Sequence, residues 1–318
     1  MRDKVIHFLR KYDGYVSGEE MSGTLHISRA AIWKYMQELR KDGYDIVAVP
    51  HLGYKLVSVP DKLFPPELQE GLKTKILGKK IFYQETVSST MDVAFQMAVQ
   101  GAPEGTVVCA ENQTKGRGRL GRAWSSPKGK GIYMSIILRP QLPPSEVAKL
   151  TLLSAVALCE AIESETSLHP RIKWPNDLLI KNKKLAGILT ELSAEVDKVK
   201  FVVMGIGINV NTSPGALPEG GTSLKNESGQ SYSRIQMTQS ILTAIEEWYG
   251  RLSREGFTPV VERWKELSLT LGKRVRISDP AGKVEGEAID LDTDGGLLIR
   301  EDSGLITKRM AGDVLLAH

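Results

Sequence analysis

Residues 115–122, with the sequence Lys-Gly-Arg-Gly-Arg-Leu-Gly-Arg, combine cationic side chains with glycines between two apolar segments that predict strands. Glycine lets backbone N–H groups come close to an anion, and the arginines can neutralise the anion from outside. The stretch therefore favours a phosphate or carboxylate ligand. A solvated basic surface loop and an arginine-glycine segment that binds RNA are the alternatives, and the stretch by itself does not decide between them.

The sequence disfavours several other kinds of active site. No Gly-Lys-Ser/Thr follows residues 115–122, which excludes a Walker loop, and no helix is predicted directly after them, which argues against a dinucleotide fingerprint. The chain has no convincing Ser-His-Asp or Cys-His arrangement. Its two cysteines, Cys109 and Cys159, lie in apolar surroundings, and its five histidines lack metal-ligand spacing. A disulfide framework and a metal site built by the protein are therefore disfavoured.

A second group of reactive side chains lies at 171–177 (Arg-Ile-Lys-Trp-Pro-Asn-Asp) and 183–189 (Lys-Lys-Leu-Ala-Gly-Ile-Leu), where charge interrupts apolar strand patterns. A charge that is buried in a sheet needs a partner. Asn182 and Lys183 are expected to form the turn between these strands, which places Lys184 near the start of the second strand, on the sheet. The alternative for Lys184 is an ordinary surface lysine at a strand end.

Gly205 and Gly207 lie inside a third apolar strand pattern, Gly-Ile-Gly-Ile-Asn. Glycine weakens a strand and often indicates that a ligand or another backbone comes close. A β-bulge without a ligand explains the pair equally well. The sequence leaves both explanations open.

The chain as a whole has 318 residues, of which 41% are hydrophobic and 25% are charged, so it is long enough for two or three globular domains. The net charge of +4 permits a nucleic-acid surface without requiring one. The first residues lack the apolar run of a signal peptide, and no later segment is long and apolar enough to span a bilayer. We therefore expect a cytoplasmic protein with no membrane partner.

Helical spacing at the start of the chain predicts three short helices at 4–11, 18–24 and 29–41, the last two capped by Ser17 and Ser28. The period then changes to two on both sides of a turn, which predicts a hairpin and completes a winged helix-turn-helix. The third helix of such a module lies in the major groove of DNA. Protein docking is the alternative, and the sequence favours DNA. The residues expected to contact DNA are Ser28, Arg29, Ala31, Lys34, Tyr35 and Lys55.

Pro60, Pro65 and Pro66 predict an irregular linker, after which a new domain begins. Apolar periodicity then predicts strands alternating with helices, followed by an all-β tail from residue 271 with Asp-Pro, Asp-Gly and Ser-Gly turns. A polar segment at 211–231 is expected to be a long loop or lid. The predicted strands are 81–85, 105–110, 131–138, 171–177, 183–189, 201–204, 274–277, 284–289, 296–299 and 305–307, and the predicted helices are 91–100, 145–163, 233–255 and 259–270.

Six short segments together resemble the bifunctional biotin–protein ligases that also repress transcription of the biotin operon. They occur in the family's order between the predicted winged helix and the predicted small barrel, so the resemblance covers essentially the whole chain. Met91, where a polar residue is common, and Leu120, where a basic residue is frequent, depart from the pattern. The segments are Ser88-Ser89-Thr90, Gln113, Gly116-Arg117-Gly118-Arg119, Lys173-Trp174-Pro175-Asn176-Asp177, Lys184-Leu185-Ala186-Gly187-Ile188-Leu189 and Gly205-Ile206-Gly207-Ile208-Asn209.

The resemblance implies an α+β fold with three domains. These are a winged helix-turn-helix at 1–62, a mixed-sheet ligase domain at 63–269 that is similar to class II aminoacyl-tRNA synthetases, and an SH3-like β-barrel at 270–318. It also implies a two-step reaction. The carboxylate of biotin attacks the α-phosphate of ATP to give biotinyl-5′-adenylate, and a lysine of a carrier protein then takes the acyl group. Biotin and ATP are the implied ligands, with Mg²⁺ bound to the nucleotide.

The same resemblance assigns roles to residues of this chain. Lys184 lies between the carboxylate and the α-phosphate, Asp177 lies where the acceptor lysine loses a proton, and Arg117 and Arg119 close over the adenylate; these four are the candidate catalytic residues. Trp124 either covers the ligand or packs in the core. The residues expected around biotin are Ser89, Thr90, Met91, Gln113, Gly116, Arg117, Gly118, Arg119, Lys184 and Gly187. Those expected around ATP are Arg119, Trp124, Lys173, Asn176, Lys184 and Asn209.

The implied partners are a biotin carboxyl carrier protein or domain, operator DNA, and a second copy of the chain once biotinyl-5′-AMP is bound. Glycines make residues 115–122 costly to order, and arginines make the ordering depend on an anion, so we expect a conditional lid whose ordering builds a dimer face. A lipoate-type acyl ligase and a non-catalytic, ligand-sensing transcription factor are the alternatives. The Gly-Arg-Gly-Arg and Lys-Trp-Pro-Asn-Asp segments favour biotin, and Lys184, Arg117 and Arg119 favour catalysis.

Overall fold

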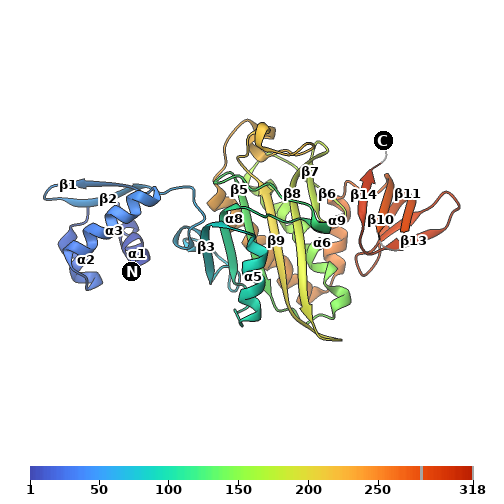
Figure 1. Cartoon of the computed structure of the whole chain (residues 1–318), viewed down its shortest axis with the longest axis horizontal. Coiled ribbons are helices and arrows are strands. Elements are labelled where there is room, and N and C mark those ends of the chain that lie inside the picture. The colour runs from blue at the N-terminus through green and yellow to red at the C-terminus, as the bar shows by residue number, and fades with distance from the viewer. Residues whose placement is uncertain (280–281, 317–318) are drawn as a thin grey trace. The chain divides into compact units, whose positions relative to one another are not determined.

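The computed structural model describes residues 1–279 and 282–316. The chain divides into two compact units, Met1–Glu70 and Gly71–His318 (Figure 1). Helices and largely antiparallel sheets occur in both units, which confirms the predicted α+β fold class. The three domain boundaries expected from the sequence stay a prediction.

The smaller unit is a winged helix-turn-helix, as predicted. Ser17 and Ser28 cap the second and third helices, because their hydroxyls accept hydrogen bonds from the backbone N–H groups of Glu20 and Ala31. The inner stripe of the third helix, which includes Ile32, is fully buried. The elements are α1 (Arg2–Arg10), α2 (Gly18–Leu25), α3 (Arg29–Asp42), β1 (Asp45–Val49), β2 (Gly53–Ser58) and α4 (Pro65–Gln69), and β1 pairs antiparallel with β2.

Helix α4 corrects the expectation that Pro65 and Pro66 continue an irregular linker. Proline is tolerated in the first turn of a helix, where its missing N–H is not needed, so these two residues begin α4. Glu67 of α4 is buried, pairs with Arg10 of α1 and accepts a hydrogen bond of 2.6 Å from the Tyr44 hydroxyl. The prolines therefore start an element of the smaller unit.

A seven-stranded mixed sheet forms the centre of the larger unit, with the strand order β3-β4-β5-β9-β8-β7-β6. Strand β3 runs parallel to β4, and all other neighbours in this sheet are antiparallel. Its strands are β3 (Ile81–Val87), β4 (Val107–Gln113), β5 (Gly131–Leu138), β6 (Arg171–Lys173), β7 (Asp177–Ile180), β8 (Lys183–Ala194) and β9 (Val199–Asn209). The helices of this unit are α5 (Thr90–Val99), α6 (Ala148–Glu165), α7 (Leu224–Ser228), α8 (Arg234–Glu255) and α9 (Thr258–Leu267).

Helices cover both faces of this sheet, as the almost continuous burial of β9 requires. Successive side chains of a strand point to opposite faces. Val203 of β9 packs in an apolar cluster with Ala94 of α5, whereas the next residue, Met204, contacts the Ser154 hydroxyl of α6 at 2.8 Å. Helix α5 therefore lies on one face and α6, which packs against α8 and α9, lies on the other (Figure 1).

The C-terminal part of the larger unit is a five-stranded antiparallel sheet with the order β13-β12-β11-β10-β14. The sequence predicts four of these strands and misses β14, because four residues show too little alternation and only pairing with β10 identifies them as a strand. The predicted Asp-Pro turn includes residue 280, which lies outside the described residues. The strands are β10 (Arg274–Asp279), β11 (Gly282–Leu291), β12 (Leu297–Arg300), β13 (Ile306–Arg309) and β14 (Asp313–Leu316).

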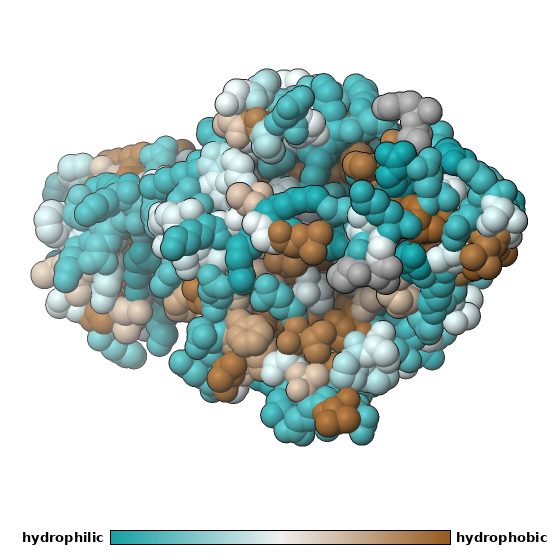
Figure 2. All heavy atoms as spheres, turned by 45° about the vertical axis from the view of Figure 1, so that its right-hand side comes forward, coloured by the Kyte–Doolittle hydropathy of each residue, from teal (hydrophilic) through white to brown (hydrophobic). Residues whose placement is uncertain are grey.

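The surface of the molecule is mixed. Figure 2 shows one face, on which hydrophilic side chains predominate and apolar side chains form separate groups. Exposed large apolar side chains include Trp33 and Leu52 in the smaller unit and Leu120 and Val196 in the larger one. No helix within residues 1–279 and 282–316 is both long and apolar enough to cross a membrane.

A buried ion pair joins the start of α8 to β4. Arg234 Nη1 lies 2.7 Å from Glu111 Oε2, and both side chains are only 2% exposed. Arg234 also donates to the carbonyl oxygen of Gly131 at 3.2 Å, and Gly129 N–H donates to the carbonyl oxygen of Glu111 at 3.1 Å. The pair therefore fixes the end of β4. This strand precedes residues 115–122, which are called here the basic loop. The sequence gives no signal for it, because its members are 123 residues apart.

The substitution Arg234→Leu should lower the free energy of unfolding by about 3–5 kcal/mol, because it leaves the Glu111 carboxylate buried without its cation. The double variant E111L/R234L should recover much of this loss, since no charge then remains buried. Denaturant unfolding followed by circular dichroism measures both effects.

The matched control is Lys128→Ala, which breaks an exposed pair with Glu85 and should cost less than about 1 kcal/mol. A single variant R234L as stable as the control would contradict the structural role of the pair.

Candidate active site

The larger unit contains a cavity of about 430 Å³, called here the main cavity. Its floor is the face of the central sheet on which α5 packs. Gly205 and Gly207 lie on the same face of β9 as Val203, because every second residue of a strand points to the same side. Leu189 and Gly187 of β8 lie directly opposite Gly205 and Gly207, respectively. The walls come from the start of α5, the basic loop, the turn between β6 and β7, and the C-terminal sheet.

The glycines of the floor make room for two large side chains. A Cβ atom at Gly207 would lie 2.5 Å from Trp124 Cε2, and one at Gly205 would lie 2.5 Å from Met91 Sδ. The close approach that the glycine pair predicts is made here by side chains of the protein, and the regular pairing of β9 at these residues excludes a bulge. Trp124 spans the floor, because a Cβ at Gly187 would also meet its ring at 3.2 Å.

A polar network lines the end of the main cavity next to α5. Gln113 Oε1 accepts from the backbone N–H of Thr90 at 2.8 Å and from its hydroxyl at 3.1 Å, while Gln113 Nε2 donates to the Ser126 hydroxyl at 3.0 Å. Ser89 caps α5, and its buried hydroxyl accepts from Met91 N–H. Fixed donors and acceptors at a buried end suit the polar ring of a small ligand.

Lys184 is held on the sheet by its own backbone. Its N–H donates to the carbonyl oxygen of Gly220 at 2.8 Å, and its carbonyl oxygen accepts from Thr222 N–H at 2.8 Å. The turn before it consists of Lys181 and Asn182, both with positive φ, one residue earlier than expected. The placement of Lys184 near the start of the second strand is nonetheless as predicted.

The contacts of Lys184 also correct the expectation of a long loop or lid at 211–231. That segment contains a one-turn 3₁₀ helix, Pro214–Ala216, and the helix α7, which Ser223 caps. Its polar residues form capping hydrogen bonds, which is the reason that a polar composition does not prevent a helix here. Residues 220–222 pair with Lys184, so the segment supports the site from the side.

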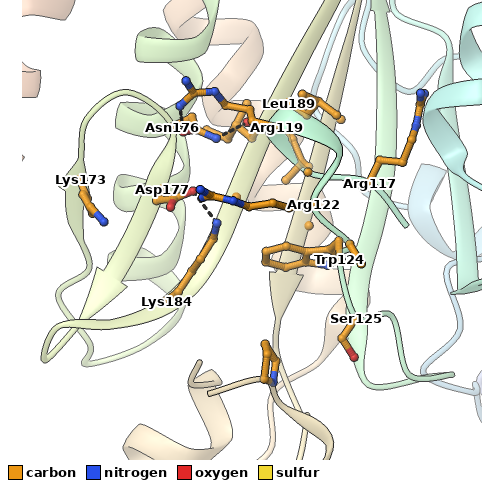
Figure 3. A pocket seen from close by; sticks show the side chains of 18 of the residues that line it. Arg117, Arg119, Arg122, Trp124, Ser125, Lys173, Asn176, Asp177, Lys184 and Leu189 are labelled. Carbon is orange, nitrogen blue, oxygen red and sulfur yellow. Dashed lines mark hydrogen bonds and ion pairs between the residues drawn. The ribbon is translucent and has the colours of Figure 1, made fainter. Parts of the chain in front are cut away.

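The side chain of Lys184 points to Asp177. Its Nζ lies 2.7 Å from Asp177 Oδ1 and 5.5 Å from the centre of the Trp124 ring (Figure 3). The Lys184 side chain is 41% exposed, so it is not a sequestered structural charge. An incoming anion can reach it from the cavity.

The three arginines of the basic loop have different partners. Arg119 donates to Asn176 Oδ1 at 2.8 Å and to the carbonyl oxygen of Gly312 at 3.0 Å. Arg122 pairs with Asp313 at the start of β14. Arg117 points away from Asp177 and Lys184 (Figure 3). Its partners are Asp92 of α5, at 2.7 Å, and Glu191 of β8, at 3.4 Å.

The charge around the main cavity is predominantly positive, with five cationic side chains against three carboxylates. Burial lowers the pKa of the Lys173 ammonium, and nearby Asp177 partly opposes this effect. Burial also lowers the pKa of the Arg119 guanidinium, against the opposing influence of Asp313 and Asp177. Both groups are thus cations that have lost hydration, and they gain most from an anionic ligand. The arrangement suits a ligand with a phosphate or a carboxylate.

The structure brings together nearly all the residues that the sequence proposes for the central site. The exception is Gly116, which does not line the cavity; its carbonyl oxygen accepts from Trp124 N–H at 2.8 Å. Sequence reasoning missed Arg122, Leu189, Gly312 and Asp313, which also line the main cavity. Arg122 belongs to the cationic stretch 115–122, so the sequence could have predicted it, whereas nothing in the residues next to Asp313 indicates a role in the cavity. The proposed residues that line the cavity are Ser89, Thr90, Met91, Gln113, Arg117, Gly118, Arg119, Trp124, Lys173, Asn176, Asp177, Lys184, Gly187 and Asn209.

The residues proposed for DNA contact lie on α3 and β2 of the smaller unit. Arg29 and Lys34 are exposed, each within 4.0 Å of an acidic side chain, whereas Ala31, Tyr35 and Lys55 are half-buried. The Ser28 hydroxyl is used as the cap of α3. Trp33, which is 59% exposed on the same helix, was missed because aromatic residues are expected in a core.

Three parts of the chain match known families. Residues 2–55 match the HTH domain, residues 83–209 match the Biotin/lipoate A/B protein ligase family, and residues 270–316 match the Biotin protein ligase C terminal domain. These matches cover both the α3 helix and the main cavity.

Full-length relatives agree with these matches. The chain is 42% identical over 319 residues to the bifunctional ligase/repressor BirA of Bacillus spizizenii, which covers 99% of this chain and 98% of the relative. It is 31% identical over 306 residues to the protein of the same name from Escherichia coli, which covers 94% of this chain and 92% of the relative. A solved structure of the biotin protein ligase from Aquifex aeolicus in complex with biotin and ATP superimposes with a TM-score of 0.65 at 31% identity, covering 75% of this chain and 99% of that one.

The substitution Gly207→Ala should destabilise the protein by about 1–3 kcal/mol, because the new methyl group displaces the Trp124 ring. In a Trp124→Ala background the same substitution should cost less than about 1 kcal/mol. Urea unfolding of the four proteins of this double-mutant cycle measures the coupling.

The intrinsic preference of the strand for alanine over glycine is present in both backgrounds and cancels in the cycle. The matched control is Gly187→Ala, whose Cβ would lie 3.2 Å from the Trp124 ring. Its coupling energy with Trp124→Ala should be smaller than that of Gly207→Ala. An equal cost of Gly207→Ala in both backgrounds would show that Trp124 does not lie on the floor.

Proposed function

Because the chain belongs to the Biotin/lipoate A/B protein ligase family and its full-length relatives are bifunctional, we infer that it is a biotin–protein ligase that also represses transcription. It makes biotinyl-5′-AMP from biotin and ATP and transfers the biotinyl group to a lysine of a carboxylase carrier domain. The observation that carries the ligase function is the Lys184–Asp177 pair, set among the cationic side chains of the main cavity.

The first half-reaction is an electrostatic problem, since a carboxylate must approach a polyanionic triphosphate. Catalysis of such a step consists mainly of positioning and of charge stabilisation. Lys184 supplies a cation that can contact both reacting anions, because its backbone fixes its base while its Nζ remains accessible. Arg119 and Lys173 add charge that burial has made less hydrated.

The ligand occupies the main cavity in a defined direction. The polar network of Ser89, Thr90 and Gln113 binds the biotin ring, and Gly187 lines the same cavity. Trp124 contacts the ligand from the floor of the cavity; its indole N–H has no hydrogen-bond acceptor among the residues that the structure describes. The nucleotide lies toward Asn176 and Asn209, next to the cationic side chains.

Mg²⁺ comes with the nucleotide. In residues 1–279 and 282–316, no three His, Cys, Asp or Glu side chains are grouped to hold a metal ion. Asp177 and the amide oxygen of Asn209, both on the lining of the main cavity, are ligands of the oxygen type that Mg²⁺ prefers. These residues fit an ion that the nucleotide phosphates hold in part.

The repressor function belongs to the smaller unit. Its α3 presents Arg29, Lys34 and Trp33 to solvent, a combination of cations and one aromatic side chain that suits phosphates and base edges of operator DNA. Since both the operator and the carrier domain are partners, the protein acts in the cytoplasm.

The corepressor is biotinyl-5′-AMP, which links the two activities through the basic loop. The arginines of the basic loop contact α5, the central sheet and the C-terminal sheet. An anion that draws these arginines away from their present partners therefore changes several surfaces together. The ordered loop forms part of a dimer face, and the dimer places two winged helices on a two-fold-symmetric operator.

The substitution Lys184→Met should lower the rate of biotin-dependent pyrophosphate release by about 10²–10³-fold, because one fixed cation at the reacting groups is lost. The unfolding free energy should change little, since the side chain is 41% exposed. The readouts are pyrophosphate release and transfer of labelled biotin to a carrier domain. Lys183→Met, at the exposed neighbour, is the matched control and should retain full activity.

The same assay separates the alternatives. A lipoate-type ligase would release pyrophosphate with lipoate and not with biotin, and a non-catalytic sensor would release it with neither acid. Either result would overturn the inferred activity.

Addition of biotin and ATP should shift the protein from monomer to dimer in sedimentation velocity and should raise its affinity for operator DNA. The physical reason is that the bound adenylate stabilises the ordered loop, and the ordered loop forms part of the dimer face. The K184M protein, which makes adenylate about 10²–10³-fold more slowly, should show both responses only after a correspondingly longer incubation, or at once when biotinyl-5′-AMP is supplied. An unchanged monomer–dimer equilibrium in the active protein would exclude the coupling.

A further inference from the structure

A second cavity of about 160 Å³, called here the side cavity, adjoins the main cavity. The two cavities share one wall, which consists of Arg119, Trp174, Pro175, Asn176, Ile188 and Leu189. The remaining lining of the side cavity comes from the first turn of α6, from β8, and from two turns of the C-terminal sheet. These residues are Ala148, Thr151, Leu152, Thr190, Gly295, Met310 and Ala311, and none of them lines the main cavity.

Within the shared wall, Arg119 Nη1 donates a hydrogen bond to Asn176 Oδ1 at 2.8 Å. Asn176 is fixed, because its Nδ2 also donates to the carbonyl oxygen of Ile188 at 2.8 Å. Arg119 belongs to the basic loop, between Gly118 and Gly121. A movement of the Arg119 side chain, or of its glycine-flanked segment, would remove this hydrogen bond from the shared wall.

The lining of the side cavity combines apolar side chains with two hydroxyl groups. Leu152 and Met310 supply apolar surface, and Met310 is 40% exposed. The hydroxyls of Thr151 and Thr190 lie 2.8 Å from each other on α6 and β8. Such a lining suits a side chain with an aliphatic stem and a polar tip, which is the description of lysine.

We propose that the acceptor lysine of the carrier domain reaches the bound acyl-adenylate through the side cavity, while biotin and ATP use the main cavity. The proposal rests on the ligase activity inferred above. It makes Ala148, Thr151, Met310 and Ala311 the mouth of an acceptor channel, and it makes Arg119 the gate between the two substrates.

A separate route for the acceptor suits the transfer step. The 430 Å³ of the main cavity falls within the roughly 300–1,000 Å³ of small-molecule sites, so we expect the bound acyl-adenylate to occupy it. The shared wall contains Asn176, and Asp177 is the next residue, which places the inner end of the channel beside the reacting groups.

The transfer step is balanced without a further reagent. The neutral amine of the acceptor lysine attacks the acyl carbon of biotinyl-5′-AMP, a C–N bond forms, and the C–O bond to the phosphate breaks. AMP leaves with the electron pair of that bond. The proton that the amine loses passes to the Asp177 carboxylate and then to solvent.

The test blocks the channel with a thiol reagent. Ala311 is exposed, and the two native cysteines, Cys109 and Cys159, are fully buried, so Ala311→Cys provides a selective site for a bulky disulfide-forming reagent. Modification should slow biotin transfer from purified biotinyl-5′-AMP to a carrier domain at least tenfold, and reduction of the disulfide should restore it. Pyrophosphate release from biotin and ATP, and reaction of the adenylate with hydroxylamine, should stay within about twofold of the unmodified rates.

The matched control is Val196→Cys, at a residue that is 93% exposed and lines neither cavity. Its modification should leave the transfer rate unchanged. The variant Ala148→Trp narrows the mouth from the α6 side and should reproduce the transfer defect without a reagent, with A148S as its control.

Three outcomes would overturn the proposal. Transfer that is unchanged after modification of A311C would show that the acceptor uses another route. Slower pyrophosphate release with normal transfer from supplied adenylate would assign the side cavity to the nucleotide. Absence of biotin-dependent pyrophosphate release in the unmodified parent protein would instead refute the inferred ligase activity on which the proposal rests.

Discussion

The close approach of two large side chains to the glycines of β8 and β9 is the constraint on which the site depends. Trp124 and Met91 occupy space that a Cβ at Gly207 or Gly205 would fill. The same packing anchors the basic loop, because Trp124 N–H donates to the carbonyl oxygen of Gly116 on the other side of the arginines. The floor of the cavity and the position of the loop are therefore one structural feature.

The charges of the site fall into a fixed set and a movable set. Lys184 and Asn176 are fixed through backbone pairing and through the hydrogen bond of Asn176 to Ile188. Arg117 extends from a glycine-rich loop to α5, and Arg119 and Arg122 extend from it to the C-terminal sheet. A fixed cation serves chemistry, because it requires no reorganisation during reaction, whereas movable cations let a bound anion change distant surfaces.

The sequence predicts those local features of the fold that depend only on residues close together in the chain. The caps at Ser17 and Ser28 act within three residues, and the sequence predicts both correctly. The same kind of reasoning failed at Pro65-Pro66, where a linker and a first helical turn have the same local signature. It also failed for β14, a short strand that exists only because β10 offers it a pairing edge.

The sequence by itself determined the fold class, the family resemblance and almost the whole set of residues around the main cavity, because these depend on residue type and order. Only the tertiary structure decided which of them touch. Arg119 meets Gly312 across 193 positions, and Arg234 meets Glu111 across 123. Such contacts arise from the packing of sheets and helices, which no local spacing encodes. The same packing sets the shared wall between the two cavities, and with it the possible routes of the two substrates.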